Sequence, residues 1–239
     1  MKIALIGYGK MGKTIEQIAL SKGHEISFKI DVENIVDLEK INPENTDVAI
    51  EFTTPHSAYS NVLKCLQQGV NVVCGTTGWN DKLPDAQKLA LDKGLAMLWT
   101  SNFSIGVNLF FKLNQQLAKL MNGIEGYTPE ITEIHHIHKK DAPSGTAITL
   151  AEGLLENFPA KKEWKLAPEG NGNNLIITAE REGEVTGTHI IKYDSAVDYI
   201  EITHLAKNRQ GLAVGAVLAA EFLKGKKGIF GMTDVLGLK

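Results

Sequence analysis

The chain has 239 residues, of which 43% are hydrophobic and 22% are charged, and its formal net charge is −3 at pH 7. This composition supports a packed core, and the negative net charge argues against a general nucleic-acid-binding protein. No apolar run reaches the roughly 18 residues that a membrane-spanning helix needs, and the first residues do not resemble a signal peptide. Cys65 and Cys74 form no CxxC pair, so we expect two buried thiols in a cytoplasmic protein.

The first hundred residues alternate between strand-like and helix-like segments. Short apolar runs predict strands, and amphipathic spacing predicts helices between them. The expected strands are 2–6, 24–30, 47–52, 70–74 and 95–99, and the expected helices are 11–21, 58–68 and 85–93. Such alternation is typical of βαβ units, so we expect an α/β fold with a Rossmann-like, doubly wound parallel sheet at the amino terminus.

The pattern changes in the second half of the chain. A long helix is expected at 106–121 and a shorter one at 145–158, with strands at 127–136, 175–179, 189–193 and 199–203. Short turns between the last three strands indicate an α+β domain with a mixed, largely antiparallel sheet. Residues 159–174, rich in Lys, Gly and Asn, are expected to form an exposed excursion. The small residues of 212–223 predict a helix that packs closely on a sheet and returns to the first domain.

A glycine-rich loop joins the first strand to the first helix. Gly7, Tyr8, Gly9, Lys10, Met11 and Gly12 form a GxGxxG motif in the context that favours dinucleotide binding. Asp31 ends the second strand, where a carboxylate can accept from the ribose hydroxyls. Val32 follows it, so NADH is favoured over NADPH, although Lys10 and Lys29 keep NADPH possible. The alternative is a glycine turn that serves packing only.

Two further loops end strands of the same predicted sheet. The first is Gly75, Thr76 and Thr77, and the second is Thr100, Ser101, Asn102 and Phe103. Because ligands of open parallel sheets lie at the carboxyl ends of strands, we expect both loops at the nicotinamide end of the cofactor. Residues 51–55 end another strand and line the same crevice in this interpretation. Ordinary polar turns are the alternative for each loop.

Residues 135–148 combine groups for proton transfer with groups for binding an anion. If the strand stays extended, His135 and Lys139 share one face, and His136 and His138 share the other. Acid–base catalysis by His135 and Lys139 is the favoured interpretation. A metal site at His136 and His138 lacks further ligands in an obvious motif, so none is expected. A structural histidine cluster is the remaining alternative.

A helix start follows this segment directly. Ser144 is a good N-cap residue, and Gly145 and Thr146 fall in the first turn, where free N–H groups suit a carboxylate. With Lys139 nearby, the preferred substrate is an acid, with a dicarboxylate as one option.

The segment from His135 to Ala147 resembles the signature of the 4-hydroxy-tetrahydrodipicolinate reductase family, also called dihydrodipicolinate reductases. The resemblance extends over nearly the whole chain through weaker motifs in the same order, namely the glycine loop, 51–55, 75–78, 102–108, 201–204 and 228–236. It implies reduction of a cyclic imine dicarboxylate by NADH or NADPH, with loss of the 4-hydroxyl group as water, in lysine and diaminopimelate biosynthesis.

The resemblance also implies residue roles and an assembly. His135 is then the acid–base group and Lys139 the proton donor, while the substrate is held by His136, Ser144, Gly145 and Thr146. The cofactor is held by residues 7–12, Asp31, 75–77 and 100–103. Arg209, next to a hinge, is expected from its position to reach the cofactor or the substrate. Residues 1–104 and 209–239 would form the dinucleotide-binding domain, and 105–208 the domain for substrate binding and tetramerisation. The chain departs from the family pattern in its tighter glycine loop, in Glu51 where Asp is frequent, and in Val32 where Arg is frequent.

Two other readings are open from the residues. An aspartate dehydrogenase-like enzyme would share the glycine loop without needing the block from His135 to Thr146. A non-catalytic NAD-sensing module would keep Asp31 but has no use for His135 and Lys139.

Overall fold

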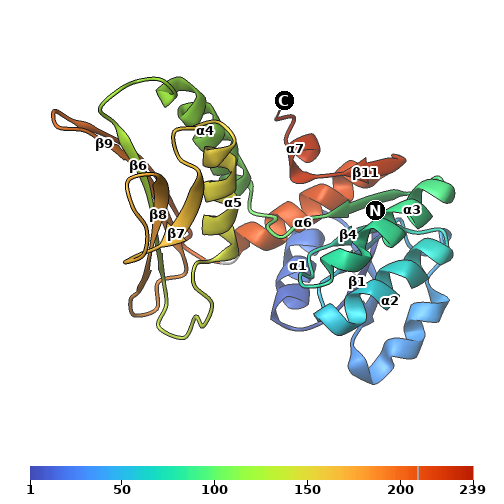
Figure 1. The fold of residues 1–239 in the computed structure, drawn as a ribbon. Coiled ribbons are helices and arrows are strands. Elements are labelled where there is room, and N and C mark those ends of the chain that lie inside the picture. The colour runs from blue at the N-terminus through green and yellow to red at the C-terminus, as the bar shows by residue number, and fades with distance from the viewer. Residues whose placement is uncertain (209, 239) are drawn as a thin grey trace. The chain divides into compact units, whose positions relative to one another are not determined.

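Residues 1–208 and 210–238 are described by the computed structural model, and they form two units (Figure 1). One unit comprises Met1–Ile105 and the segment that begins at Gln210, and the other begins at Gly106 and ends before Gln210. Each unit has its own sheet and its own hydrophobic core. Arg209, expected at the cofactor, lies outside the described residues.

The first unit is built on a six-stranded sheet with the strand order β11-β5-β4-β3-β1-β2. Every neighbouring pair is parallel, which confirms the predicted Rossmann-like sheet. The strands are β1 (Lys2–Ile6), β2 (Glu25–Ile30), β3 (Val48–Glu51), β4 (Asn71–Cys74), β5 (Ala96–Trp99) and β11 (Gly228–Phe230).

Helices cover both faces of this sheet, as predicted for a doubly wound fold. Ile3 and Leu5 of β1 pack in one core, with residues of α1 (Lys10–Ser21) and α6 (Gln210–Leu223). Ala4 and Ile6 pack in the opposite core, with residues of α2 (Pro55–Gln67) and α3 (Leu83–Asp92). Since successive strand residues point to opposite faces, β1 contributes to both cores.

Some short elements of this unit are absent from the sequence prediction. They are the 3₁₀ helices η1 (Val32–Lys40) and η2 (Asn80–Lys82), strand β11 and helix α7 (Met232–Val235). β11 has three residues and pairs with β5 at the edge of the sheet. η2, β11 and α7 have only three or four residues and carry too little periodicity to be recognised, and η1 is interrupted by the non-helical backbone of Asn34.

The second unit contains a five-stranded sheet with the order β10-β9-β6-β8-β7. The strands are β6 (Thr128–His135), β7 (Glu163–Leu166), β8 (Asn174–Arg181), β9 (Thr188–Asp194) and β10 (Tyr199–Leu205). β9 is antiparallel to both β6 and β10, whereas β8 is parallel to both β6 and β7. The sheet is mixed, as predicted. It has as many parallel as antiparallel strand pairs, whereas the short turns in the sequence indicated a largely antiparallel sheet.

Two helices, α4 (Ile105–Met121) and α5 (Gly145–Leu155), cover one face of this sheet (Figure 1). Their apolar residues, such as Phe110 and Leu150, pack with Ile131 of β6 and Ile177 of β8 in a single core. The inward residues of β6 alternate with outward ones, which fixes the face that carries His135.

Three expectations for this unit are wrong in detail. The strand expected to reach residue 136 ends at His135, and α5 ends at Leu155 rather than at 158. The excursion expected at 159–174 contains β7, an edge strand whose Trp164 and Leu166 pack against the core. The surrounding Lys, Gly and Asn residues obscured this four-residue strand.

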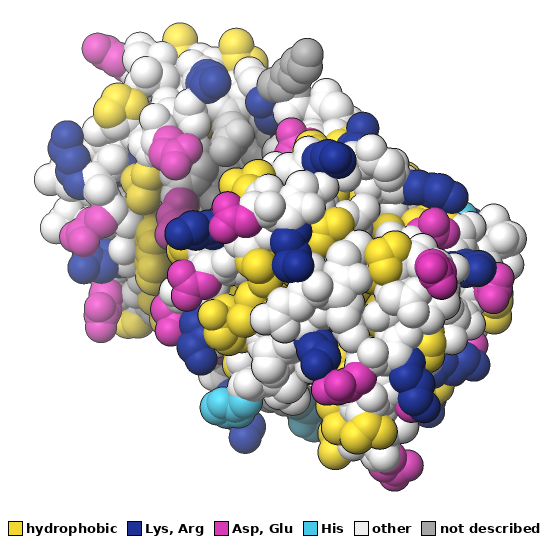
Figure 2. Space-filling model, turned by 90° about the vertical axis from the view of Figure 1, so that its right-hand side faces the viewer, with side chains coloured by type: hydrophobic (Ala, Val, Ile, Leu, Met, Phe, Trp, Pro, Cys, Tyr) yellow, Lys and Arg dark blue, Asp and Glu magenta, His cyan; other side chains and the backbone are white. Residues whose placement is uncertain are grey.

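Within the described residues, no helix is both long and apolar enough to cross a membrane. On the face shown in Figure 2, basic and acidic side chains are interspersed, in keeping with the small net charge.

Candidate active site

The glycine loop of the first unit has the packing that its sequence predicts. Gly7 has φ +91°, and a Cβ there would lie 1.9 Å from the carbonyl oxygen of Phe52. A Cβ on Gly12 would lie 2.3 Å from the carbonyl oxygen of Gly7, whereas one on Gly9 would meet no atom within 4 Å. The outer glycines therefore permit close packing, and Gly9 leaves open space where a pyrophosphate can approach the backbone.

Two cavities adjoin this loop at the carboxyl ends of the strands. One, of about 500 Å³, contains Asp31 and Val32, and the other, of about 390 Å³, contains Gly75, Thr76 and Thr77. Both are also lined by Gly9, Phe52 and Thr53, which belong to the glycine loop and to the segment after β3. The structure thus brings together the glycine loop, Asp31, the 75–77 loop and residues 52–55. The sequence did not reveal the cavity residues Ile35 of η1 and Ser57, Ser60 and Asn61 of α2.

Asp31 and Thr76 are each held in place by local hydrogen bonds. Asp31 accepts from the backbone N–H of Val32 at 2.9 Å and caps η1. The carbonyl oxygen of Thr76 accepts from the indole N–H groups of Trp79 and Trp99 at 2.8 and 2.9 Å, and its hydroxyl accepts from the N–H of Thr53 at 2.8 Å. Two tryptophans therefore fix the 75–77 loop.

The 100–103 loop contributes in a different way from the other loops. The N–H of Thr100 donates to the carbonyl oxygen of Cys74, which ties the ends of β4 and β5 together. The Phe103 ring is buried, and its centroid lies 5.6 Å from that of Phe52. Phe103 therefore supports a cavity wall from behind, so its side chain is not free to contact a cofactor. Ser101 is exposed.

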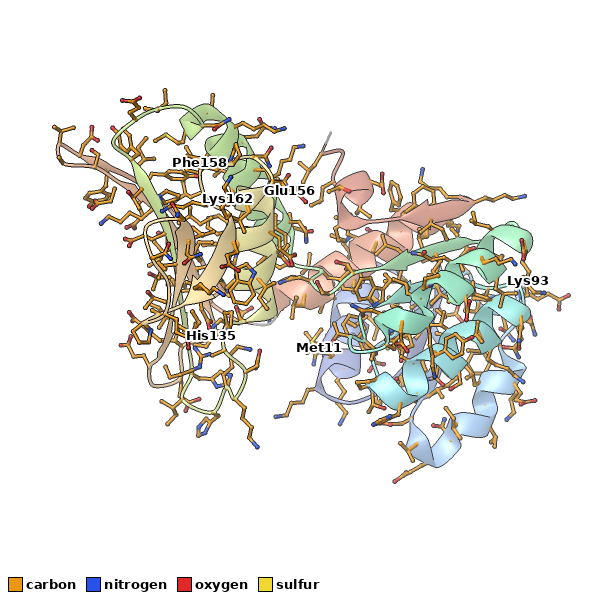
Figure 3. All side chains as sticks on the ribbon, in the orientation of Figure 1. Met11, Lys93, His135, Glu156, Phe158 and Lys162 are labelled. Carbon is orange, nitrogen blue, oxygen red and sulfur yellow. The ribbon has the colours of Figure 1, made fainter. Side chains whose placement is uncertain are left out.

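In the second unit, His135 is the last residue of β6 (Figure 3). It lies beside the fully buried carboxylate of Glu133. Nδ1 of His135 forms an ion pair with Glu133, whose other oxygen lies 3.1 Å from the guanidinium of Arg181. Burial raises the pKa of Glu133, but hydrogen bonds from His135 and Arg181 outweigh it, so the net shift is downward. A carboxylate on Nδ1 fixes the ring and leaves Nε2 as the nitrogen available for proton transfer.

The space at Nε2 of His135 depends on a glycine. A Cβ on Gly187 would lie 3.0 Å from this nitrogen, so a side chain there would crowd it. The sequence did not reveal Glu133, Arg181 or Gly187. Arg181 lies across from His135 only because β8 is the neighbour of β6, and Gly187 directly precedes β9 on the other side of β6. For Glu133 a signal exists, since residues i and i+2 of a strand share a face.

A second buried histidine connects this pair to the start of α5. His189 lies directly across from Glu133 in the β6–β9 register, and its ring centroid is 5.2 Å from that of His135. Its Nε2 is 3.1 Å from the hydroxyl oxygen of Ser144. Burial, and next the charge of His135, lower the pKa of His189 to about 4. His189 is therefore neutral at neutral pH.

Ser144 is the N-cap of α5, as predicted. Its hydroxyl oxygen accepts from the N–H of Ala147 at 3.1 Å, and its side chain is buried. A Cβ on Gly145 would meet no atom within 4 Å, so the space before the helix start is open. The first turn of α5, around Gly145 and Thr146, has the geometry that suits an anion, and Ser144 holds that turn.

Lys139 reaches the site by a turn rather than by an extended strand, which corrects the expected strand geometry. β8 ends at Arg181 and β9 begins at Thr188, so β6 loses its strand partners beyond His135. The N–H of Lys139 donates to the carbonyl oxygen of His136, and its Nζ lies 2.8 and 2.7 Å from the two Asp141 oxygens. The pKa of Asp141 is lowered chiefly by this hydrogen bond.

His136 and His138 stay close to each other, with ring centroids 6.0 Å apart. His136 is half-buried and directly follows His135, whereas His138 is exposed and pairs with Glu184 at 3.4 Å.

Among the described residues, Glu133, His135 and His189 form the one group of three side chains whose ligand atoms could hold a metal ion, all within 4.8 Å of one another. The HxH pair considered from the sequence is not in this group. The Arg181 guanidinium on Glu133 competes with a metal ion for that carboxylate. The arrangement suits an oriented imidazole better than a metal centre.

The chain matches two family descriptions that together cover almost all of it. Residues 1–103 match "Dihydrodipicolinate reductase, N-terminus", and residues 106–236 match "Dihydrodipicolinate reductase, C-terminus". A 4-hydroxy-tetrahydrodipicolinate reductase of Christiangramia forsetii is 49% identical over 236 residues, covering 99% of this chain and 98% of that protein. One of Neisseria gonorrhoeae is 34% identical over 231 residues, covering 93% and 84%.

Solved structures agree at the level of the fold. A dipicolinate-bound dihydrodipicolinate reductase from a Paenisporosarcina species has a TM-score of 0.78 at 24% identity, with 98% of each chain covered. An engineered D-amino acid dehydrogenase reaches only 0.54 at 12% identity, covering 100% of this chain and 96% of that one. The resemblance seen in residues 135–147 is thus confirmed, and the chain belongs to the dihydrodipicolinate reductase family.

Proposed function

We propose that this enzyme reduces 4-hydroxy-2,3,4,5-tetrahydrodipicolinate to tetrahydrodipicolinate, in lysine and diaminopimelate biosynthesis. The reaction takes up one hydride and one proton and releases one water. Family membership supports the reaction. The observation that carries the catalytic assignment is the His135–Glu133 pair at the end of β6. The segment that follows it contains Lys139 and leads to the open start of α5.

The residues of the first unit fit a nicotinamide dinucleotide. The open backbone at Gly9 suits the pyrophosphate, and Asp31 suits the adenosine ribose in the adjoining cavity. The bound cofactor would supply the hydride. NADH is the preferred cofactor in this proposal, because Asp31 repels a 2′-phosphate and the exposed Val32 after it offers no positive charge.

The residues of the second unit hold the substrate and move protons. The start of α5 binds one carboxylate through its N–H groups, with Gly145 allowing close approach, and His136 adds a further contact. Nζ of Lys139 donates the proton that balances the negative charge left after hydride addition, and Nε2 of His135 serves as the acid–base group beside it. Glu133 and Arg181 keep that imidazole in one orientation.

The direct test is NADH oxidation with freshly generated 4-hydroxy-tetrahydrodipicolinate, repeated with NADPH. Turnover that depends on this substrate, with a higher kcat/KM for NADH, supports both parts of the proposal. No turnover with either cofactor contradicts the reductase activity, whereas a higher kcat/KM for NADPH contradicts only the cofactor preference.

We further propose a cytoplasmic homotetramer assembled through the sheet of the second unit. On β10, the hydrophobic residues Tyr199, Ile200 and Leu205 are 61%, 39% and 59% exposed. Exposing such a group of apolar side chains to water is unfavourable, and a subunit interface would bury them. The free thiols Cys65 and Cys74 support a reducing compartment. Light scattering after size-exclusion chromatography checks the assembly, and a monomer mass at micromolar concentration contradicts it.

A further inference from the structure

Three side chains from different elements meet beside the glycine loop. The Tyr8 hydroxyl in the loop donates to Oε2 of Glu16 on α1, and Nζ of Lys29 on β2 lies 2.5 Å from the other oxygen, Oε1. The same Nζ lies 5.3 Å from the centre of the Tyr8 ring. The Glu16 side chain is only 14% exposed, so bulk water competes weakly for its carboxylate. Glu16 therefore connects the loop, the helix and the strand that surround the expected cofactor.

Lys29 is close in sequence to the residue expected at the adenosine ribose. Lys29 belongs to β2, and Asp31 follows β2 with an extended backbone, so about 6.6 Å separates their Cα atoms. The 2′-phosphate of NADPH occupies the place of a hydroxyl that Asp31 is suited to bind in NADH. A lysine stem is long enough to bring its ammonium to that phosphate. In the structure the ammonium points to Glu16 instead.

We infer that Glu16 is a specificity-determining residue, which holds the Lys29 ammonium away from the adenosine ribose and so disfavours NADPH. The inference rests on the proposed dinucleotide site and deepens the proposed preference for NADH. Hydrogen bonding from Lys29, and next from Tyr8, lowers the pKa of Glu16, and hydrogen bonding to Glu16 raises the pKa of Lys29. Both groups are therefore charged at neutral pH, and their charges cancel locally.

The test measures binding rather than turnover. Fluorescence titration gives the Kd of NADH and of NADPH for wild type, Glu16→Gln, and Glu16→Gln combined with Lys29→Gln. Glutamine keeps the size and can still accept from Tyr8, but it releases the lysine. We expect the ratio of the NADPH Kd to the NADH Kd to fall about fivefold in Glu16→Gln, the scale of a freed charge in a partly exposed site. Removing Lys29 from that variant restores the higher ratio.

A matched control removes the same charge elsewhere in the first unit. Glu221 of α6 pairs with Lys22 and His24, each at 2.7 Å, just beyond the end of α1 opposite to the glycine loop. Glu221→Gln is expected to leave the ratio of the two Kd values unchanged. A fall equal to that of Glu16→Gln would assign the effect to net charge and overturn the inference.

Two further outcomes overturn it. One is an unchanged ratio in folded Glu16→Gln, and the other is a fall that persists when Lys29 is also removed.

The single variant Lys29→Gln keeps the inference testable if Glu16→Gln does not fold. Because Glu16 already holds the lysine away, this variant should have the same ratio of NADPH Kd to NADH Kd as wild type. A selective loss of NADPH affinity in Lys29→Gln would show that the lysine already binds the phosphate and would overturn the inference. Cofactor binding can be measured without turnover, so this test can be carried out even if the reductase assay fails. The ratio of the two Kd values in the wild type separately tests the preference for NADH.

Discussion

At the scale of single residues, the two proton-transfer candidates have different surroundings. His135 is buried and held by Glu133, which is in turn held by Arg181. Lys139 lies on a turn, and both of its short polar contacts go to the more exposed carboxylate of Asp141. His135 is therefore held by a buried network, whereas the Lys139 ammonium is held by one exposed carboxylate with which a substrate carboxylate could compete.

Replacing Lys139 should affect the chemistry far more than replacing its partner. Lys139→Met keeps the stem and removes the proton donor, so kcat should fall about 10²–10⁴-fold. The control Asp141→Asn frees the ammonium and should keep kcat within about tenfold of wild type. Steady-state kinetics with saturating NADH measures both. A Lys139→Met enzyme with nearly full kcat would rule out the lysine as the donor.

His189 should make the protein less stable in acid. Its pKa of about 4 in the folded state lies below the ordinary value of 6.5, so between these values the unfolded chain binds the proton more readily. Stability from the neutral, buried imidazole is full above about pH 6.5 and is lost as the pH falls towards 4, by about 3 kcal/mol. Urea unfolding at pH 7 and pH 4 should show a smaller loss for His189→Gln than for wild type. Equal losses would mean that His189 is not the group that titrates.

At the scale of elements, the start of α5 depends on Ser144. The hydroxyl caps the helix and also contacts the buried His189, so Ser144→Ala should lower the free energy of unfolding by about 2–3 kcal/mol. Thr149→Ala on the exposed side of the same helix removes a hydroxyl contact to Gly145 and should change it by less than about 0.5 kcal/mol. Chemical denaturation distinguishes the two variants. Similar losses would contradict the capping role.

The packing of α6 gives a second comparison within one element. A Cβ on Gly215 would lie 1.8 Å from the carbonyl oxygen of Phe103, whereas the nearest atom to one on Gly211 is the Ser104 hydroxyl oxygen at 3.5 Å. Gly215→Ala should therefore cost about 1–3 kcal/mol of stability. Gly211→Ala should be neutral or stabilising by up to about 1 kcal/mol, because alanine favours a helix. Thermal unfolding should give a lower Tm than wild type for Gly215→Ala and an equal or higher Tm for Gly211→Ala.

Elements with strong periodicity were predictable, and short or boundary elements were not. The apolar run of Lys2–Ile6 and the helical spacing in 106–121 each predict an element from local information alone. The end of β6 is set by where β8 and β9 stop, which depends on pairing between residues about 50 positions apart in the chain. For β7, the packing of Trp164 against the core overrides a composition that is typical of a loop.

At the scale of the whole molecule, each of the two units carries its own group of candidate site residues. Local motifs revealed the glycine loop, Asp31 and the segment from His135 to Thr146. The residues that fix them come from elsewhere in each unit: Trp79 and Trp99 hold Thr76, while Arg181 and His189 contact Glu133 or Ser144. No motif or spacing in the sequence predicts these partners, because strand pairing in the sheets brings them together from distant parts of the chain. Function was therefore more predictable than the network that supports it.

The most direct test of the central claim follows the hydride itself. NADH carrying deuterium at the transferred position of its nicotinamide ring is incubated with the enzyme and 4-hydroxy-tetrahydrodipicolinate, and the product is analysed by mass spectrometry. The expected product is tetrahydrodipicolinate with one deuterium, formed at the rate of NADH oxidation and suppressed in Lys139→Met. NADH oxidation without labelled tetrahydrodipicolinate, or no reaction at all, would contradict it.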